Sequence, residues 1–442
     1  MNSIKRLILP ELVTWKDSPT RMPLLLRGAR QVGKSYLIEL FGRTYFKNMI
    51  VINFEESSEY IPCFESLKIE EIIAKIEILS NTLFIPGDTL LFLDEIQLCP
   101  KAISSLRYFK EKRSDLHVIG AGSLLEFALE DKGISIPVGR IQYLYLRPIS
   151  FLEFLLATNN IALKEYLDKV SINDKIPSEI HQKALSLVRE YMVIGGMPAV
   201  VDSYLKTKNF LHVQRLQTSI LKTYSDDFGK YANRSQHPYL RQVFDKTPTL
   251  VGDQIKYVNI SNSLDSRNLK QAIYNLNKAG VITSIYSTSP ASLPFSSNAN
   301  KKKFKLLFLD IGLMNRVSKL EAQTLMSEDI DLVSKGALAE QFVGSELLSL
   351  QDPYEDNGLY YWQRDAKNSS SEVDYVINIG DKIIPLEVKA GVTGRLKSLR
   401  MIMEEFNLPL GIKISSKELD LDSQKGILSI PFYLIYRLSN LL

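Results

Sequence analysis

The chain has 442 residues, 45% of them hydrophobic and 24% charged, with a net charge of +4, which predicts an ordinary folded protein of about three domains and excludes a largely disordered one. The apolar run directly before Pro10 is only three residues long, and no apolar run approaches the length of a membrane span, so we expect a cytoplasmic protein with no membrane partner. The two cysteines, Cys63 and Cys99, support neither a disulfide framework nor a cysteine zinc site.

A phosphate-binding loop follows the first predicted strand. The residues LLLR at 24–27, an apolar strand, run into GARQVGKS, and the helical pattern SYLIELFG comes next. The motif G-x-x-x-x-G-K-S therefore has a strand before it and a helix after it. The glycines let successive amides face phosphates, the lysine reaches the terminal phosphates, and the serine ligates magnesium. We therefore expect ATP and Mg²⁺ as cofactors and a nucleotide contact from Gly28, Ala29, Arg30, Gln31, Val32, Gly33, Lys34 and Ser35.

Two further strands are predicted to end beside this loop. The run TLLFLDEIQ from Thr89 is apolar throughout, as a buried parallel strand is, and ends in an acid pair. We expect Asp94 to join Ser35 around magnesium and Glu95 to orient or deprotonate the attacking water. The strand LHVIGAG leads to Ser123, where a polar side chain can touch the terminal phosphate or the water.

An arginine after this region is a candidate for catalysis in a neighbouring subunit. Arg140 lies before the predicted strand IQYLYLRPI, where its side chain can stabilise the charge that develops on the neighbour's nucleotide. This role implies a homo-oligomer. A surface salt bridge is the plain alternative for Arg140, and Arg147 or Arg107 can take the same catalytic role.

The order of these motifs resembles the AAA+ branch of P-loop ATPases. GARQVGKS, LLFLDEIQ, GAGS, the GR before RPISFLEF, GGMP, EVDYVI and IPLEVK together resemble one prokaryotic family. That family pairs an AAA+ ATPase with a C-terminal domain similar to PD-(D/E)xK nucleases. The resemblance implies an α/β fold with a P-loop AAA+ core over residues 1–150.

The middle of the chain is predicted to contain a helical lid and a winged helix. Apolar residues recur at three and four positions over residues 151–236, where GGMP ends one helix and opens the next. Residues 237–320 predict helices, the last of them SRNLKQAIYNLNKAG, followed by the strands VITSIYS and KKFKLLFLD, and helices with such a two-stranded wing form a winged helix.

The winged-helix segment is basic. From His237 to Lys319 there are 12 Lys and Arg against 4 Asp and Glu, a balance of +8. Such an excess favours a phosphate-bearing partner, and we expect DNA contacts from Arg267, Lys270, Gln271, Lys278, Lys301, Lys302 and Lys303. A winged helix that contacts a protein or acts as a spacer is the alternative, because no set of side chains here indicates sequence-specific contacts to base edges.

The C-terminal residues 321–442 predict the element order αβββαβ of a restriction-endonuclease-like domain. Glu387 and Lys389 fall on one face of a strand, about 6.5 Å apart. Asp374 lies on the paired strand and Glu340 on the leading helix. Together with Glu387 they are predicted to form a magnesium site, at which Lys389 steadies the attacking water. The alternative is the solvated face of a hairpin, to which Glu372 also belongs.

These patterns together predict an ATPase that couples its nucleotide state to DNA binding or processing, with nuclease activity left open. The competing hypothesis is an ATP-dependent regulatory switch whose C-terminal modules bind a protein partner without cleavage.

Overall fold

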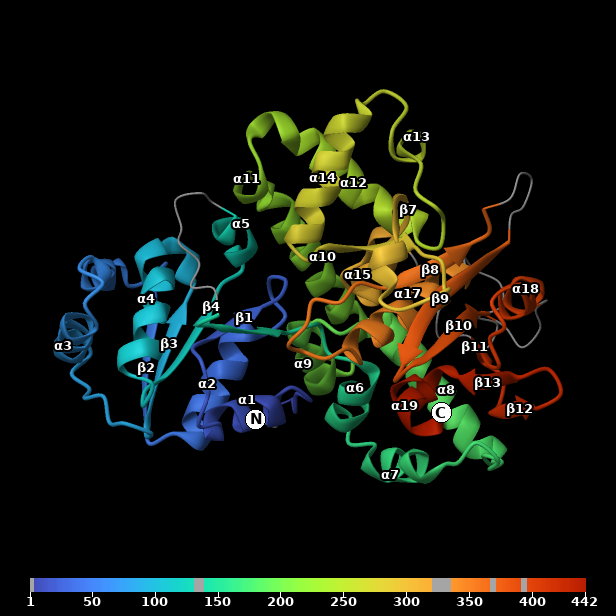
Figure 1. Ribbon diagram of the computed structural model, residues 1–442, viewed down its shortest axis with the longest axis horizontal. Coiled ribbons are helices and arrows are strands. Elements are labelled where there is room, and N and C mark those ends of the chain that lie inside the picture. The colour runs from blue at the N-terminus through green and yellow to red at the C-terminus, as the bar shows by residue number, and fades with distance from the viewer. Residues whose placement is uncertain (1–3, 131–138, 320–334, 366–370, 391–395) are drawn as a thin grey trace.

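The chain forms two sheets, one at each end, with a bundle of helices between them (Figure 1). This computed structural model describes residues 4–130, 139–319, 335–365, 371–390 and 396–442.

The first sheet has five parallel strands in the order β2-β3-β4-β1-β5. Every residue of β3 is buried, which explains its unbroken apolar sequence. The strand β1 pairs with β4 and β5, so Leu25 lies opposite Gly120 and Tyr143. The helices and strands of this part are α1 Leu9–Asp17, β1 Leu24–Arg27, α2 Lys34–Tyr45, β2 Asn48–Asn53, α3 Ile69–Ser80, β3 Thr89–Asp94, α4 Pro100–Lys112, β4 His117–Ala121, α5 Leu125–Leu129 and β5 Gln142–Tyr145.

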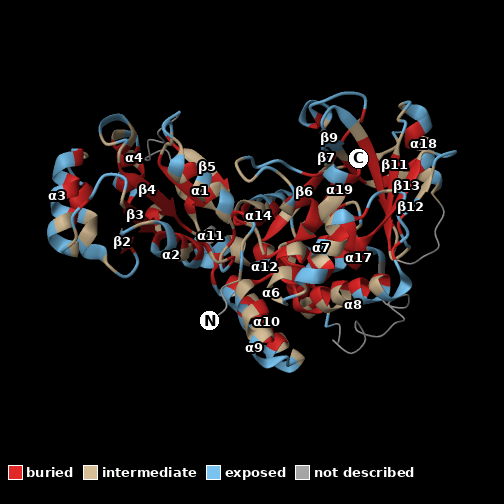
Figure 2. Cartoon of the chain, turned by 90° about the horizontal axis from the view of Figure 1, so that it is seen from below, coloured by how far each residue is buried: buried red, intermediate tan, exposed pale blue. Residues whose placement is uncertain are grey.

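Helices cover both faces of this sheet. Residues of α1 and α2 pack on one face and residues of α3 and α4 on the other, which gives two separate hydrophobic cores. In Figure 2 the strands β3 and β4 are red between helices whose outer sides are pale blue. The parallel α/β core expected at the N-terminal end is therefore confirmed.

Helices form most of the middle of the chain. As expected, the glycine pair of GGMP ends one helix, because α8 stops at Ile194, and Pro198 opens α9. The apolar face of α14, formed by Leu269, Ile273 and Leu276, is buried. The helices are α6 Phe151–Ala157, α7 Ile161–Lys169, α8 Ser178–Ile194, α9 Pro198–Thr207, α10 Phe210–Asp226, α11 Phe228–Tyr231, α12 His237–Leu250, α13 Tyr257–Ile260, α14 Ser266–Lys278 and α15 Ile311–Val317.

The second sheet joins the hairpin of β6 and β7 to the C-terminal strands. Its eight strands follow the order β12-β13-β11-β10-β9-β8-β6-β7, and β6 pairs with β8 in parallel. Its lower-numbered strands are β6 Ile282–Ser287 and β7 Asn300–Phe308, which pair as the antiparallel hairpin expected from sequence. The remaining elements are α17 Lys335–Ser349, β8 Tyr360–Gln363, β9 Glu372–Ile379, β10 Lys382–Val388, α18 Lys397–Glu405, β11 Gly411–Ser415, β12 Asp420–Asp422, β13 Ile427–Pro431 and α19 Leu438–Leu441.

One hydrophobic core runs from Ile149 to Leu441 and includes residues of the lid helices, the winged-helix segment and the C-terminal part. A smaller core under α18 contains Trp362, which is 3% exposed. The boundary expected after residue 236 therefore does not separate two cores. The boundary expected after residue 320 lies outside the described residues.

The described helices were also compared with the requirements of a membrane span. None is long and apolar enough to cross a bilayer by itself, although the bent pair α8 and α9 passes the test of length and composition.

Candidate nucleotide site and C-terminal acidic cluster

The loop between β1 and α2 has the backbone shape that phosphate binding requires. Gly28 and Gly33 have φ values of +139° and +93°, and Gln31 also has a positive φ of 61°. A Cβ on Gly28 would lie 2.2 Å from the carbonyl oxygen of Leu146, so only glycine fits this position. Gly33 then caps α2, whose N-terminal amides and dipole favour an anion.

Lys34 lies inside this loop. Its ammonium donates hydrogen bonds to the carbonyl oxygens of Gly28 and Ala29, both at 2.8 Å. Burial lowers the pKa of Lys34 to about 8, although Glu95 and Asp94 oppose this effect. The lysine is thus held by neutral carbonyl groups that a phosphate oxygen can replace.

Ser35 and Asp94 form the oxygen pair expected around magnesium. The Ser35 hydroxyl donates to Asp94 Oδ2 at 2.7 Å. Asp94 is buried, which raises its pKa, while the bond from Ser35 opposes that shift. A hydroxyl and a carboxylate in contact fit a hard cation such as Mg²⁺, which prefers oxygen ligands and keeps several waters.

Glu95 and Ser123 are brought together as expected. Glu95 Oε2 accepts hydrogen bonds from the Ser123 hydroxyl at 3.2 Å and from the Ser123 amide at 3.4 Å. The side-chain amide of Gln97 also donates to this oxygen, at 2.5 Å. Gln97 was not among the expected residues, although its place two residues after Glu95 is a usable signal. Arg30 Nε donates to Ser123 Oγ at 3.0 Å.

The three arginine candidates lie in different surroundings. Arg140 is 48% exposed and pairs with Glu111 on α4 at 3.3 Å, and Arg107 pairs with the same acid at 2.9 Å. Arg147 instead donates to Gln351 at 3.4 Å, and burial lowers its pKa. Because Arg147 is directed into its own chain, it does not suit a role in a neighbouring subunit. Arg140 stays a prediction.

The lid is tied to the phosphate loop and to β7 by buried polar contacts. Arg6 donates to the carbonyl oxygens of Val32 at 3.0 Å and Arg147 at 2.6 Å. Ile149 donates its amide to Gly196, whose own amide donates to Asp310 at 2.5 Å. A further set of contacts joins the same elements: Arg6 pairs with Glu153 at 2.9 Å, and Glu346 accepts from the Phe151 amide at 2.9 Å.

Asp310 explains the glycine pair of the lid. A Cβ on Gly195 would lie 2.3 Å from Asp310 Oδ1, so close packing against this carboxylate leaves room only for glycine. Burial raises the pKa of Asp310 to about 6, and three backbone amides oppose that shift. Sequence reasoning missed Asp310, although an acid at the end of an apolar strand and before a helix is a typical N-cap.

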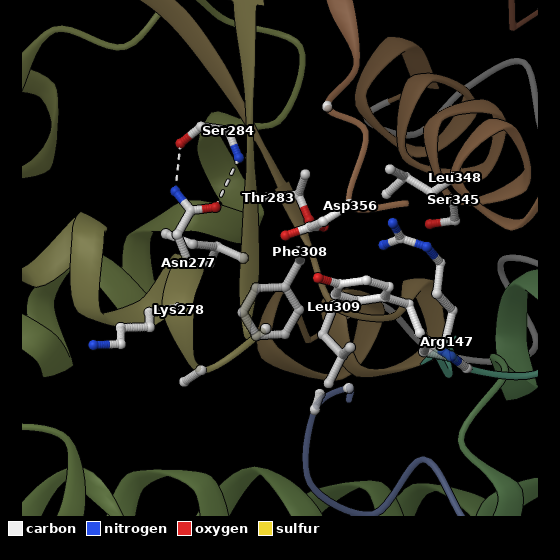
Figure 3. Close-up of a pocket in the computed structure, with 18 of the residues that line it drawn as sticks. Arg147, Asn277, Lys278, Thr283, Ser284, Phe308, Leu309, Ser345, Leu348 and Asp356 are labelled. Atoms are coloured by element: carbon white, nitrogen blue, oxygen red, sulfur yellow. Dashed lines mark hydrogen bonds between the residues drawn. The ribbon is translucent and has the colours of Figure 1, made fainter. Parts of the chain in front are cut away.

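A cavity of about 550 Å³ lies between the phosphate loop and the second sheet. Gly28 and Ser123 line it on the ATPase side, and β6, β7 and α17 line it on the other. Figure 3 shows Arg147 reaching toward Ser345 and Asp356 in this cavity, with Asn277 bonded to Ser284 on the far wall.

The expected DNA-contacting residues do not all face solvent. Those exposed are Arg267, Lys270, Gln271, Lys301 and Lys302. The side chain of Lys278 is only 11% exposed, pairs with Glu130 of the N-terminal part and lies over the ring of Phe127. Lys303 pairs with Asp365 and is partly buried.

Two of the three expected C-terminal metal ligands, Glu340 and Asp374, lie beside an ammonium group instead. Lys305 of β7 has a side chain only 2% exposed, and its Nζ lies 2.5 Å from Glu372, 3.2 Å from Glu340 and 3.7 Å from Asp374. Burial alone would lower the pKa of Lys305, but these acids together raise it. Lys305 was expected to be part of a strand and nothing more, although a single cation inside FKLLF is a signal that could have found it.

Glu387 and Lys389 form a second pair beside this cluster. Lys389 Nζ lies 2.6 Å from Glu387 Oε1, while Glu387 Oε2 is buried without a hydrogen-bond partner. Asp374 accepts from the Val388 amide at 2.7 Å. Among the described residues, no group of three or more His, Cys, Asp or Glu side chains is arranged to hold a metal ion. The set of Glu340, Asp374 and Glu387 therefore does not fit a metal here, because Lys305 supplies the positive charge.

Comparisons with known proteins bear on each part of the chain. The family model of an AAA domain matches residues 20–155, and its strands carry the loop and acids just described. Over residues 20–155 the chain is therefore similar to AAA domains, which supports ATP binding and hydrolysis, typically with Mg²⁺. Two models of domains of unknown function match residues 185–324 and 335–434.

Solved structures were compared as well. A Walker-type ATPase of Pyrococcus abyssi is 16% identical, covers 72% of this chain and 96% of its own, and has a TM-score of 0.45. The ORC1 protein of Aeropyrum pernix, in complex with DNA, is 13% identical, with coverages of 72% and 92% and a TM-score of 0.27. The T158V variant of Thermotoga maritima RuvB is 16% identical, with coverages of 62% and 88% and a TM-score of 0.29. No curated protein matches the chain.

Proposed function

We propose that the protein is a magnesium-dependent ATPase that couples ATP turnover to the binding of DNA by its middle and C-terminal parts. The observation that carries the ATPase proposal is the convergence of Lys34, the Ser35 and Asp94 pair, and Glu95 with Ser123 at the edge of one parallel sheet.

Each group has a defined role in this proposal. The amides of residues 28–35 and the ammonium of Lys34 hold the phosphates, and Ser35 with Asp94 holds Mg²⁺. Magnesium supplies positive charge that offsets the charge of the phosphates. Glu95 and Ser123 orient the attacking water, and Arg140 acts on the nucleotide of a neighbouring subunit.

The exposed cations of α14 and β7 support the DNA proposal. Arg267, Lys270, Lys301 and Lys302 are exposed, whereas Lys278 and Lys303 are paired within the chain. We assign α12, α14, β6 and β7 to a winged-helix module, because a two-stranded wing follows the helix.

The C-terminal part is proposed to be nuclease-like in fold and to bind DNA without cutting it. Its elements α17, β8, β9, β10, α18 and β11 have the order αβββαβ, and β10 pairs with β9 antiparallel and with β11 in parallel. Because Lys305 lies among the acids, we propose no metal-dependent step there. Cleavage of plasmid DNA with Mg²⁺ or Mn²⁺ that disappears in Glu387→Gln would contradict this part of the proposal.

The test of the whole proposal measures nucleotide binding and phosphate release with and without duplex DNA. Lys34→Ala should lose ATP binding, whereas Glu95→Gln should bind ATP and not turn it over. Lys47→Ala is the matched control, because Lys47 is an exposed lysine of the same domain that pairs with Asp88. Wild-type affinity in Lys34→Ala refutes the ATPase site. Turnover that DNA does not change favours a regulatory switch with a protein partner.

A further inference from the structure

The arginine of the phosphate loop is bound to the lid. Arg30 is the third residue of GARQVGKS, and its guanidinium forms an ion pair with Asp227. Their side chains are only 18% and 11% exposed, so this pair is shielded from solvent and weighs more than a surface pair does. Asp227 lies between α10 and α11, at the end of the lid nearest the loop.

The same guanidinium reaches the residues that face the attacking water. Arg30 Nε donates to Ser123 Oγ at 3.0 Å, and the Ser123 hydroxyl donates to Glu95 at 3.2 Å. Tyr224 of α10 donates its hydroxyl to the carbonyl oxygen of Arg30 at 2.6 Å. A continuous chain of polar contacts therefore runs from the lid through Arg30 to Glu95.

A guanidinium binds carboxylate and phosphate with the same planar fork of donors. Arg30 lies in the loop whose amides face phosphates, and Asp227 is the carboxylate that holds it. Lys230 is a second cation near Asp227 but holds it more weakly. Its Nζ lies 3.8 Å from Asp227 and is shared with Glu55 at 3.9 Å. A terminal phosphate placed beside Ser123 would present a second, more highly charged anion to the same guanidinium.

We propose that Asp227 and the terminal phosphate of ATP compete for the side chain of Arg30. This inference rests on the proposed ATPase function and adds a side-chain contact specific to the terminal phosphate. When the phosphate takes Arg30, α10 and α11 lose their ion pair with the loop. The helix α10 packs against α9 and α15, so loss of this ion pair also frees the helices that contact α10 to move relative to the loop.

Removing the competing carboxylate should therefore strengthen ATP binding. The free energy of a hydrogen bond to a charged group corresponds to at least about a tenfold change in affinity. Asp227→Asn should therefore bind ATP about tenfold more tightly than the wild type. ADP lacks the third phosphate, for which Asp227 competes, so the affinity of Asp227→Asn for ADP should equal that of the wild type. Asp226→Asn is the matched control, because Asp226 is the adjacent acid and is exposed.

Arg30→Ala provides a second, independent variant. It removes the group for which the two anions compete, so its preference for ATP over ADP should be smaller than that of the wild type. Adding Asp227→Asn to Arg30→Ala should then have no effect on ATP binding. A merely structural pair would instead make both single variants weaker for both nucleotides. Arg30→Ala also tests the proposal if Asp227→Asn does not fold.

Calorimetric titration of the full chain with ATP and with ADP, under conditions without turnover, measures these affinities. Unchanged or weaker ATP binding by Asp227→Asn overturns the inference, as does an equal gain for ADP. If Arg30→Ala prefers ATP over ADP as strongly as the wild type does, the inference is overturned as well. If the wild-type protein binds neither nucleotide, the proposed ATPase function fails instead.

Discussion

Replacing Lys305 by methionine should strongly destabilise the second sheet. Methionine keeps the length and apolar character of the lysine stem, so the substitution mainly removes the charge. The ammonium lies within 4 Å of Glu372, Glu340 and Asp374, and its side chain is 2% exposed. Removing one partner of a buried ion pair costs about 3–5 kcal/mol, because the remaining charge has no compensation. Three acids remain here, so we expect a loss in the upper part of that range.

The loss should also depend on pH. Burial raises the pKa of Glu340 and of Glu372, and Lys305 opposes both shifts. Without Lys305 these pKa values rise further above those of the unfolded chain, so the folded variant binds more protons than the unfolded one. Stability then falls as pH rises. The deficit of Lys305→Met relative to the wild type should therefore be larger at pH 8 than at pH 5.

Urea unfolding at the two pH values, followed by circular dichroism, measures this deficit. Lys302→Met is the control, because Lys302 is an exposed lysine of the same strand and its replacement should change stability by less than about 0.5 kcal/mol. A deficit below about 1 kcal/mol for Lys305→Met, or one that grows toward pH 5, would refute the view that this ammonium neutralises the cluster.

Other expected outcomes concern the ATPase site and the basic surface. Arg140→Ala should keep nucleotide affinity and lose turnover on the order of a thousandfold, and turnover that does not depend on protein concentration would contradict its action in a neighbouring subunit. Replacing Lys301 and Lys302 together by alanine should lower the slope of log affinity for duplex DNA against log salt by about 1.8, measured by fluorescence anisotropy. The same assay on Lys278→Ala, whose ammonium is paired internally, should give the wild-type slope. Gly28→Ala should lose ATP binding, because its Cβ has no room beside Leu146, whereas Gly336→Ala, with open space around it, should not.

Local patterns predicted the parts of the fold that depend on neighbours in sequence. The phosphate loop is indicated by Gly28, Gly33 and Lys34 within one strand, loop and helix. The apolar run of β3 indicates a buried strand from its own six residues. The face of α14 follows from its helical spacing in the same way. These features carry their physical cause within a short window of the sequence.

The features that sequence reasoning missed are contacts between distant residues. Lys305 follows three lysines and belongs by composition to a basic wing, and only the fold brings it to acids 35 and more residues away. The Arg30 and Asp227 pair joins residues 197 positions apart. An arginine in a phosphate loop and an acid after a helix each have many alternative partners. Charge patterns thus identify the groups without identifying the pairs.

These distant contacts give the nucleotide loop a direct route to the second sheet. Arg6 binds the carbonyl oxygens of Val32 in the loop and of Arg147, and two residues on, Ile149 is bonded to the lid at Gly196. The Gly196 amide donates to Asp310. Only Leu309 separates Asp310 from the end of β7, the strand that carries Lys305. Because each link is a hydrogen bond to backbone or a buried pair, a shift of the loop cannot be absorbed by flexible side chains alone. Stimulation of turnover by DNA should therefore depend on Arg6 and Asp310, the two side chains in this route that substitution can remove.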